Sequence, residues 1–288
     1  MAARTQDDRA PALRLSGVRQ AFPVGLGLRR REVLGPIDLE VARGSCVGLV
    51  GPNGSGKSTL LQLVAGVDRP VAGRVEALGG APHEARVVAR TGWMSEDSRF
   101  PTELDARSVL ELVGSLQGLA SRTARERAAA LLERVGLARE ARTPLSRWSR
   151  GMLRRLGLAA ALLCEPELLL LDEPTAGLDA PGLELLDALL GEACARGATV
   201  VIASHLVDDL HRHCGRLVVL VGGRIAADGT PQALLGGGGA LDVGLADADA
   251  ALLEELERTA RARGASWLGA RPARASLLAL YRRLGAGA

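Results

Sequence analysis

The feature that most constrains this chain is a glycine-rich loop between an apolar segment and a helical one. It reads Gly51-Pro52-Asn53-Gly54-Ser55-Gly56-Lys57-Ser58-Thr59, the G-x-x-x-x-G-K-S pattern of a phosphate-binding loop. Glycines let successive backbone N–H groups point inward at phosphate oxygens. Lys57 brings a positive charge to the outer phosphates, and the Ser58 hydroxyl is an oxygen ligand of the kind that Mg²⁺ prefers. The loop therefore predicts a site for a nucleoside triphosphate with Mg²⁺.

The segments on either side of the loop agree with that interpretation. Residues 45–50 are predicted to form a short buried strand, and residues 59–65 a helix. The N-terminus of that helix adds its dipole to the anion site. The alternative is a glycine-rich turn that contains Gly-Lys-Ser by chance, and the order of strand, loop and helix argues against it.

Composition limits the classes of protein to which the chain can belong. At 288 residues, with 47% hydrophobic and 24% charged residues, it is typical of a globular protein with a sizeable core. A net charge of +3 and an aromatic content of 2% argue against a nucleic-acid partner. The four cysteines are scattered, as in reduced cytoplasmic proteins. The polar start and the lack of an apolar run of about 18 residues predict neither a signal peptide nor a membrane span.

The order of predicted elements indicates an α/β protein with insertions. After a disordered tail over residues 1–12, residues 13–18 and 33–41 are predicted strands, with the Gly/Arg-rich turn 25–31 between them. Within that turn, Arg29-Arg30-Arg31 could touch phosphate or lipid head groups, but a solvated hairpin tip is favoured. Residues 87–93 contain a further strand, and about 96–165 form an inserted helical subdomain.

Strands and helices then alternate again, which favours a mostly parallel sheet covered on both faces. The predicted strands lie within residues 167–171, 198–203, 217–221 and 224–227, with helices over 182–194 and 206–213. A glycine linker at 236–240 precedes a small appendage over 241–288, with helices expected at 248–263 and 275–284.

A pair of acids follows the apolar run Leu168–Leu171. This run predicts a central strand that delivers Asp172 and Glu173 to its C-terminal end, where ligands bind in open α/β sheets. Asp172 is placed to hold Mg²⁺ through water, and Glu173 to act as general base toward an attacking water. The alternative is a strand end that carries two acids with no chemical role.

A second candidate anion site precedes the apolar helix predicted over residues 153–164. Ser149 and Gly151 at a helix N-terminus can bind phosphate, with Met152 beside them. An ordinary helix N-cap is the other interpretation, and these residues taken alone favour it.

Together these motifs resemble the nucleotide-binding subunit of an ATP-binding-cassette (ABC) transporter, over about residues 13–235. Gly51–Thr59 matches the family's Walker A loop, and Leu168–Glu173 matches Walker B with its catalytic glutamate. Ser149-Arg150-Gly151-Met152 matches the L-S-G-G-Q signature, and Ala176-Gly177-Leu178-Asp179 matches the D-loop. His205 matches the switch histidine, and Phe22 matches the aromatic that stacks on adenine.

The resemblance implies a P-loop NTPase fold of the ABC type: a mostly parallel sheet with an antiparallel β subdomain and an inserted helical subdomain. Two such domains would pair head to tail, as a homodimer or with a different ATPase, with each ATP between one Walker A loop and the other subunit's Ser149 signature. His205 would hydrogen-bond the γ-phosphate, and Asp179 would contact the partner subunit. The chain would drive a separate membrane permease from the cytoplasmic face of the cell membrane.

Departures from the family pattern point to one branch. Glu96 stands where the family has its Q-loop glutamine; it is a candidate Mg²⁺ ligand, and the departure leaves that contact open. Arg150 and Met152 replace the first glycine and the glutamine of the signature. These features resemble exporters of drugs, antibiotics, lipids or polysaccharides. The ending Arg271–Leu277 with Tyr281 resembles the same branch, although a plain surface helix accounts for it equally well.

Two other hypotheses stay open at this point. A soluble ABC ATPase of DNA repair, ribosome function or division would usually carry a coiled-coil insert or two cassettes, whereas this chain has one cassette and an insert of ordinary size. The other hypothesis is an ABC cassette whose ATPase activity is impaired by Glu96 and Arg150. Because Lys57, Asp172 and Glu173 are all present, we expect that the chain hydrolyses ATP.

Overall fold

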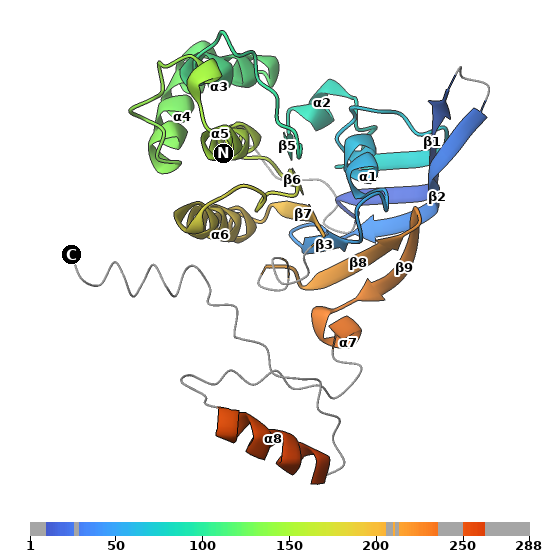
Figure 1. The fold of residues 1–288 in the computed structure, drawn as a ribbon. Helices are drawn as coiled ribbons and strands as arrows, with labels where there is room; N and C mark the ends of the chain where they lie inside the picture. Colours follow the sequence, from blue (N-terminus) through green and yellow to red (C-terminus); the bar gives the residue numbers. More distant parts are fainter. Residues whose placement is uncertain (1–9, 26–28, 206–209, 211–212, 236–249, 263–288) are drawn as a thin grey trace. The chain divides into compact units, whose positions relative to one another are not determined.

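The computed structural model describes residues 10–25, 29–205, 210, 213–235 and 250–262 (Figure 1). The chain divides into two compact units, Met1–Gly237 and Gly238–Ala288. In the second unit the structure describes the helix α8, Ala250–Ala262, within the region where a helix over 248–263 is predicted. Among the described residues, no helix combines the length and the apolar character needed to span a bilayer.

A three-stranded antiparallel sheet forms one part of the first unit. Its strands are β1 (Leu13–Val24), β2 (Arg29–Val41) and β4 (Ala72–Ala77), in the order β2-β1-β4. Alternate residues at the start of β1 are buried, which is the period expected when one face of a strand packs on a core. This sheet is the predicted antiparallel β subdomain.

The β1–β2 hairpin is longer than the sequence suggested. Phe22 pairs with Arg31 and Val24 with Arg29, so the predicted turn over 25–31 is wrong at its C-terminal end. The arginine run lies in a strand rather than at the tip. The physical reason is that backbone pairing continues beyond the buried part of the hairpin, where side-chain patterning no longer reports it.

The second sheet is the centre of the fold. Its order is β5-β6-β7-β3-β8-β9, with parallel neighbours except for the antiparallel pair β8–β9. The strands are β3 (Cys46–Val50), β5 (Thr91–Met94), β6 (Leu168–Asp172), β7 (Thr199–Ser204), β8 (Arg216–Val221) and β9 (Arg224–Gly229). Every residue of β6 and β7 is buried, as expected for parallel strands covered on both faces.

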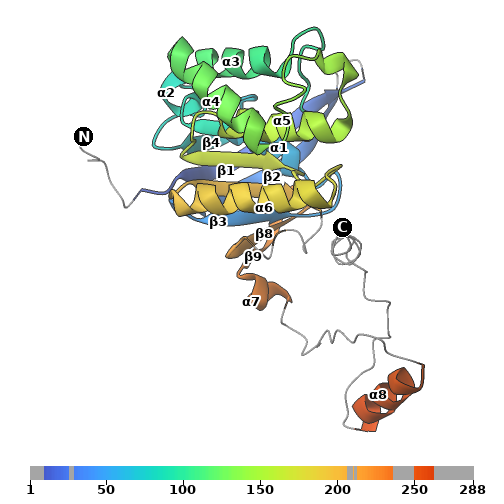
Figure 2. The same ribbon diagram turned by 90° about the vertical axis from the view of Figure 1, so that its left-hand side faces the viewer.

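Helices lie on both sides of this sheet, and Figure 2 shows α3, α4 and α5 grouped together on one side. The helices of the first unit are α1 (Lys57–Val64), α2 (Ala85–Val88), α3 (Ala106–Leu116), α4 (Ser121–Arg134), α5 (Arg150–Leu162), α6 (Ala180–Ala195) and α7 (Pro231–Leu235), with a 3₁₀ turn at Leu145–Arg147. Residues 87 and 88 belong to α2, so the strand expected within 87–93 begins only at Thr91. Predicted helices over 206–213 and 275–284 fall largely or wholly outside the described residues.

Two hydrophobic clusters cover the two faces of the central sheet. Leu169 and Leu171 of β6 pack into a cluster with α3, α4, α5 and α6. Leu168 and Leu170 of the same strand pack into a second cluster with α1 and the antiparallel sheet. Because strand side chains alternate between faces, one uniformly apolar strand supplies both cores. The predicted fold class is confirmed, and the C-terminal ends of β3, β6 and β7 meet at one edge of the sheet.

Candidate nucleotide-binding site

The phosphate-binding loop connects β3 to α1, as the sequence indicates. Gly51 follows β3 directly, and a Cβ there would lie 2.2 Å from the backbone oxygen of Leu220, so only glycine fits. Gly56 caps α1 with a φ of 101°, in the left-handed region that favours glycine. The Lys57 side chain is buried and turns back across the loop, where its Nζ donates to the carbonyls of Gly51 at 2.8 Å and Pro52 at 3.3 Å. The loop is thus closed around its own lysine.

Asp172 lies at the end of β6 and is only 2% exposed. Burial raises the pKa of this carboxyl, and the negative charges of Glu96 and Glu173 raise it further, whereas a hydrogen bond with Ser58 and the charge of Lys57 lower it. One carboxylate oxygen, Oδ1, is buried with no hydrogen-bond partner among the described residues. The site therefore holds a desolvated carboxylate next to the Ser58 hydroxyl.

These oxygen donors fit a hard divalent cation. The Ser55 hydroxyl is a second buried oxygen that lacks a partner within the described part of the chain. In that part, no group of three or more His, Cys, Asp or Glu side chains could hold a metal ion by itself. A cation at Asp172 and Ser58 would thus need further oxygens, which Mg²⁺ takes from triphosphates and water.

Glu173 is the centre of a polar cluster at the same edge. Its carboxylate lies 3.8 Å from Lys57 Nζ and 2.9 Å from His205 Nδ1, and it accepts a hydrogen bond of 3.4 Å from the Ser204 hydroxyl. Glu173 is buried, whereas 44% of the His205 side chain is exposed. The backbone of Glu173 has a φ of 48°, an uncommon value for a residue other than glycine.

The other predicted site residues lie on separate elements. Ser149 caps α5, and its hydroxyl accepts a hydrogen bond of 3.3 Å from the Met152 backbone, so the N-cap geometry is present. Gly151 and Met152 form the first turn of that helix. Asp179 caps α6 in the same way, accepting from the backbone of Gly182 at 3.0 Å.

Phe22 and Glu96 complete the predicted set. Phe22 lies on β1 and is 37% exposed, so an aromatic face is available to a ligand. Glu96 lies in the loop after β5, where its charge acts on both Asp172 and Arg154. The fold thus brings Lys57, Ser58, Asp172, Glu173 and His205 together, with Glu96 close enough to act on Asp172 electrostatically.

Arg154 is a residue of this region that the sequence reasoning missed. It lies on α5, buried to 8% exposure, and donates hydrogen bonds to the backbones of loops 95–96 and 173–176. The only signal in the sequence is a pair of adjacent arginines, Arg154 and Arg155, in a largely apolar helix, one turn after the signature. That signal does not distinguish a buried arginine from an exposed one.

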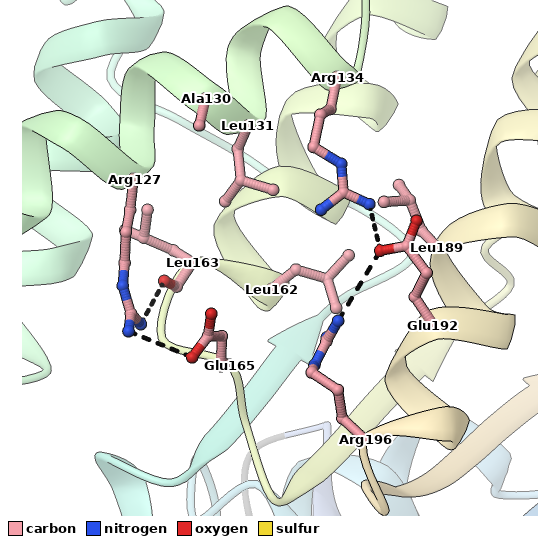
Figure 3. A pocket seen from close by; sticks show the side chains of 10 residues that line it. All are labelled: Arg127, Ala130, Leu131, Arg134, Leu162, Leu163, Glu165, Leu189, Glu192 and Arg196. Atoms are coloured by element: carbon pink, nitrogen blue, oxygen red, sulfur yellow. Dashed lines mark hydrogen bonds and ion pairs between the residues drawn. The ribbon is translucent and has the colours of Figure 1, made fainter.

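A separate pocket lies between α4, α5 and α6, and Figure 3 shows the side chains that line it. Leucines form its apolar wall, and ion pairs cross its rim: Arg134 to Glu192 at 2.5 Å and Arg127 to Glu165 at 3.2 Å. None of the predicted site residues lines this pocket. The predicted catalytic residues gather around Glu173, not at this pocket.

The fold and the site define the class of protein. A phosphate-binding loop after β3 and an Asp-Glu pair at the end of β6, a parallel strand separated from β3 by β7, make the chain a P-loop nucleoside triphosphatase. Comparisons with known proteins assign the chain to a family within this class. Residues 34–176 match the family described as ABC transporter.

Relatives of known name agree with that match. The daunorubicin resistance ATP-binding protein DrrA3 of Streptomyces coeruleorubidus is 40% identical over 222 residues, covering 76% of this chain and 70% of that protein. The Nod factor export ATP-binding protein I of Neorhizobium galegae is 38% identical over 209 residues, covering 72% and 60%. A solved ATP-binding subunit of an ABC transporter has a TM-score of 0.70 at 26% identity, covering 79% of this chain and 93% of that one.

This chain belongs to the ATP-binding proteins of ABC transporters, and it is an ATPase. The resemblance stated from the motifs is confirmed, and so is its likeness to the exporter branch, since relatives are named for drug resistance and for Nod factor export.

Proposed function

We propose that the chain powers a separate membrane permease, in the direction of export, by closing and opening a head-to-tail dimer. One observation carries the proposal: Glu173, Lys57 and His205 converge on one point at the end of the phosphate-binding loop. Support for export comes from relatives named for drug resistance and Nod factor export.

Within one subunit, different residues bind the phosphates of ATP and the metal ion. Lys57 leaves the carbonyls of Gly51 and Pro52 and pairs with the outer phosphates of ATP, while the backbone N–H groups of the loop hold the phosphate oxygens. Ser58, Asp172 through water, and Glu96 would hold Mg²⁺. That ion would supply positive charge to neutralise the phosphate oxygens.

Glu173 acts as general base in the chemical step. Its carboxylate takes a proton from water as the water oxygen bonds to the γ-phosphorus, and the bond to the β,γ-bridging oxygen breaks to leave ADP and inorganic phosphate. His205, 2.9 Å from the same carboxylate, hydrogen-bonds the γ-phosphate. The burial of Glu173 favours proton transfer because few water molecules compete for its oxygens.

The second half of each site comes from another subunit. Ser149, Gly151 and Met152 at the N-terminus of α5 bind the γ-phosphate held by the partner's loop, and Asp179 contacts the partner subunit. Phe22 stacks on adenine. Because the γ-phosphate bridges both subunits, ATP binds the closed dimer more tightly than the open one and shifts the population toward closure. Hydrolysis removes the bridge.

We also propose the partners, the cellular location and the domain boundaries of the chain. The partners are an integral membrane permease and a second ATPase subunit, identical or different, and no nucleic acid. The location is cytoplasmic, peripheral on the inner face of the cell membrane. We retain a tail at 1–12, an ATPase domain at 13–235 with its helical subdomain at about 96–165, a linker at 236–240 and an appendage at 241–288. The unit boundary after Gly237 supports the last division.

Phosphate release by the purified chain with ATP and Mg²⁺ tests the proposal. Glu173→Gln should lower turnover by about 10²–10⁴-fold, the usual contribution of a general base. The same variant should accumulate ATP-dependent dimers on size-exclusion chromatography. The matched control is Glu192→Gln, which removes an exposed carboxylate paired with Arg134 and should leave turnover unchanged. Unchanged turnover in Glu173→Gln would contradict the catalytic role.

Co-purification from detergent tests the transport role. An integral membrane protein that co-elutes with the tagged chain and stimulates its ATPase supports the proposal. Stimulation by DNA or ribosomes in place of a membrane protein would favour a non-transport ABC ATPase.

A further inference from the structure

Arg154 joins two loops around the catalytic cluster, residues 95–96 and 173–176, to α5. Its guanidinium donates from Nε to the carbonyl of Ala176 at 3.0 Å, and from Nη1 to the carbonyls of Ser95, at 3.1 Å, and Glu96. Nη2 donates to the carbonyl of Glu173. A planar fork with five N–H donors is thus bonded to four backbone oxygens, which a lysine with one nitrogen cannot reproduce.

The cost of burying this side chain indicates that it has a specific role. Burial lowers the pKa of Arg154, and the negative charges of Glu96, Asp172 and Glu173 act in the opposite direction. A buried charge persists only when it is paired and hydrogen-bonded, and here the partners are backbone atoms of loops that carry the site. The same contacts would be hard to replace by an apolar core residue.

The backbone of Glu173 is held from both sides. Its N–H donates to the carbonyl of Ala203 at 2.9 Å, and its carbonyl accepts from Arg154. Between these two bonds the residue has a φ of 48°, which directs its carboxylate toward Lys57 and His205. A residue in this sparsely populated conformation persists where its surroundings hold it there.

Because Arg154 lies on α5, its contacts link the N-terminal end of that helix to Glu173. Ser149 caps the helix and Gly151 is in its first turn, so Arg154 is about one turn away along a continuous helix. A displacement of the helix N-terminus is therefore carried directly to the carbonyl of Glu173.

We infer that Arg154 is a positioning residue for ATP hydrolysis, which ties the backbone of Glu173 to α5 so that the signature end of the helix and the general base move together. The inference rests on the proposed role of Glu173. Arg154 reaches no phosphate in this arrangement, because its donors are directed at backbone carbonyls, so it acts through Glu173.

The first test compares two neighbouring arginines in steady-state ATPase assays. Arg154→Gln should lower kcat by about tenfold to a hundredfold, the loss expected from misplacing a catalytic group, and leave KM for ATP within about twofold. The matched control is Arg155→Gln on the same helix, whose side chain bonds the carbonyl of Val135 at 3.1 Å, away from the cluster. Its kcat and KM should both stay within about twofold of the wild type.

A double-mutant cycle separates positioning from general destabilisation. In the Glu173→Gln background, Arg154→Gln should lower the residual turnover by less than about twofold, because the group that it positions is already absent. The same loss in both backgrounds would overturn the inference.

The remaining outcomes are also decisive. If the wild type hydrolyses ATP, Glu173→Gln stops it and Arg154→Gln keeps full kcat, the inference is wrong and the proposed function stands. If Glu173→Gln has no effect, the proposed function fails first. Should Arg154→Gln not fold, Arg154→Lys keeps the charge but reaches fewer carbonyls, and its kcat should lie below that of the wild type with native circular dichroism. Unfolding of both variants would assign Arg154 to core stability and overturn the inference.

Discussion

Replacement of Asp172 by Asn is expected to stabilise the nucleotide-free protein while it weakens Mg²⁺-dependent activity. The Asp172 carboxylate is 2% exposed, and its Oδ1 has no hydrogen-bond partner within the described residues. A buried polar group left unsatisfied costs about 1–3 kcal/mol, and a charged one costs more. Asn has the same shape and no charge. The free energy of unfolding should therefore rise by about 1–3 kcal/mol, which is about 2–4 °C in Tm for each kcal/mol in a domain of this size.

The increase in the free energy of unfolding of Asp172→Asn over the wild type should grow as the pH rises. Burial holds the pKa of Asp172 above its usual value of 3.8, so the folded protein binds this proton more tightly than the unfolded chain does. The contribution of Asp172 to stability is thus fully present below pH 3.8 and is lost as the pH rises to and through the raised pKa. Because Asn does not titrate, the Tm difference between variant and wild type should be small at acid pH and reach its full size at neutral pH.

Thermal unfolding by circular dichroism across pH measures this difference. The matched control is Asp105→Asn, because Asp105 caps α3 through a hydrogen bond of 2.7 Å from Ser108 and Asn is an equally good N-cap. That control should leave Tm almost unchanged. Mg²⁺ added with ATP should raise the Tm of the wild type above that with ATP alone, and this increment should be absent in the variant. A lower Tm of the Asp172 variant at neutral pH, or a difference that does not change with pH, would refute the reasoning.

Three further predictions concern the loop, the thiols and the signature. Gly51→Ala places a Cβ 2.2 Å from the carbonyl oxygen of Leu220, so calorimetric titration should give an ATP affinity at least about tenfold weaker and scanning calorimetry a lower Tm. A hydrogen bond with Cys214, together with burial, raises the pKa of Cys46, so mass spectrometry should show at least about tenfold slower alkylation of Cys46 in native protein at pH 8 than in urea. Ser149→Ala should cost about 1 kcal/mol through loss of the N-cap and should weaken ATP-driven dimerisation in sedimentation runs, with ATP binding to the monomer unchanged. Equal alkylation rates, unchanged ATP affinity or unchanged dimerisation would contradict the corresponding prediction.

Most of the fold class could be predicted because its signals are local. Apolar strands alternate with helices, and a uniformly apolar run precedes Asp172. In each case the burial of a segment can be predicted from the residues of that segment alone. Errors arose where side chains carry no such signal. Phe22 and Arg31 pair in exposed parts of β1 and β2, and residues 87 and 88 form one short helical turn before β5.

The candidate site was predictable to the same extent and for the same reason. A phosphate-binding loop uses contiguous backbone groups, so the pattern Gly51–Thr59 can be recognised from neighbouring residues alone. The convergence of Glu173 with Lys57 and His205 could be expected only through the family resemblance, because 116 and 32 positions of chain separate these partners from Glu173.

The sequence alone thus determined the phosphate-binding loop, the acidic pair at a strand end and the alternation that builds a parallel sheet, since each depends on neighbouring residues. Only the tertiary structure decided the strand order β6-β7-β3, the return of Lys57 onto its own loop and the burial of Arg154 among four carbonyls. Those features depend on which segments meet in space. The sequence does not distinguish an arginine that will be buried from one that will be exposed to solvent. The backbone carbonyls that accept its hydrogen bonds in the buried case come from loops distant in the chain.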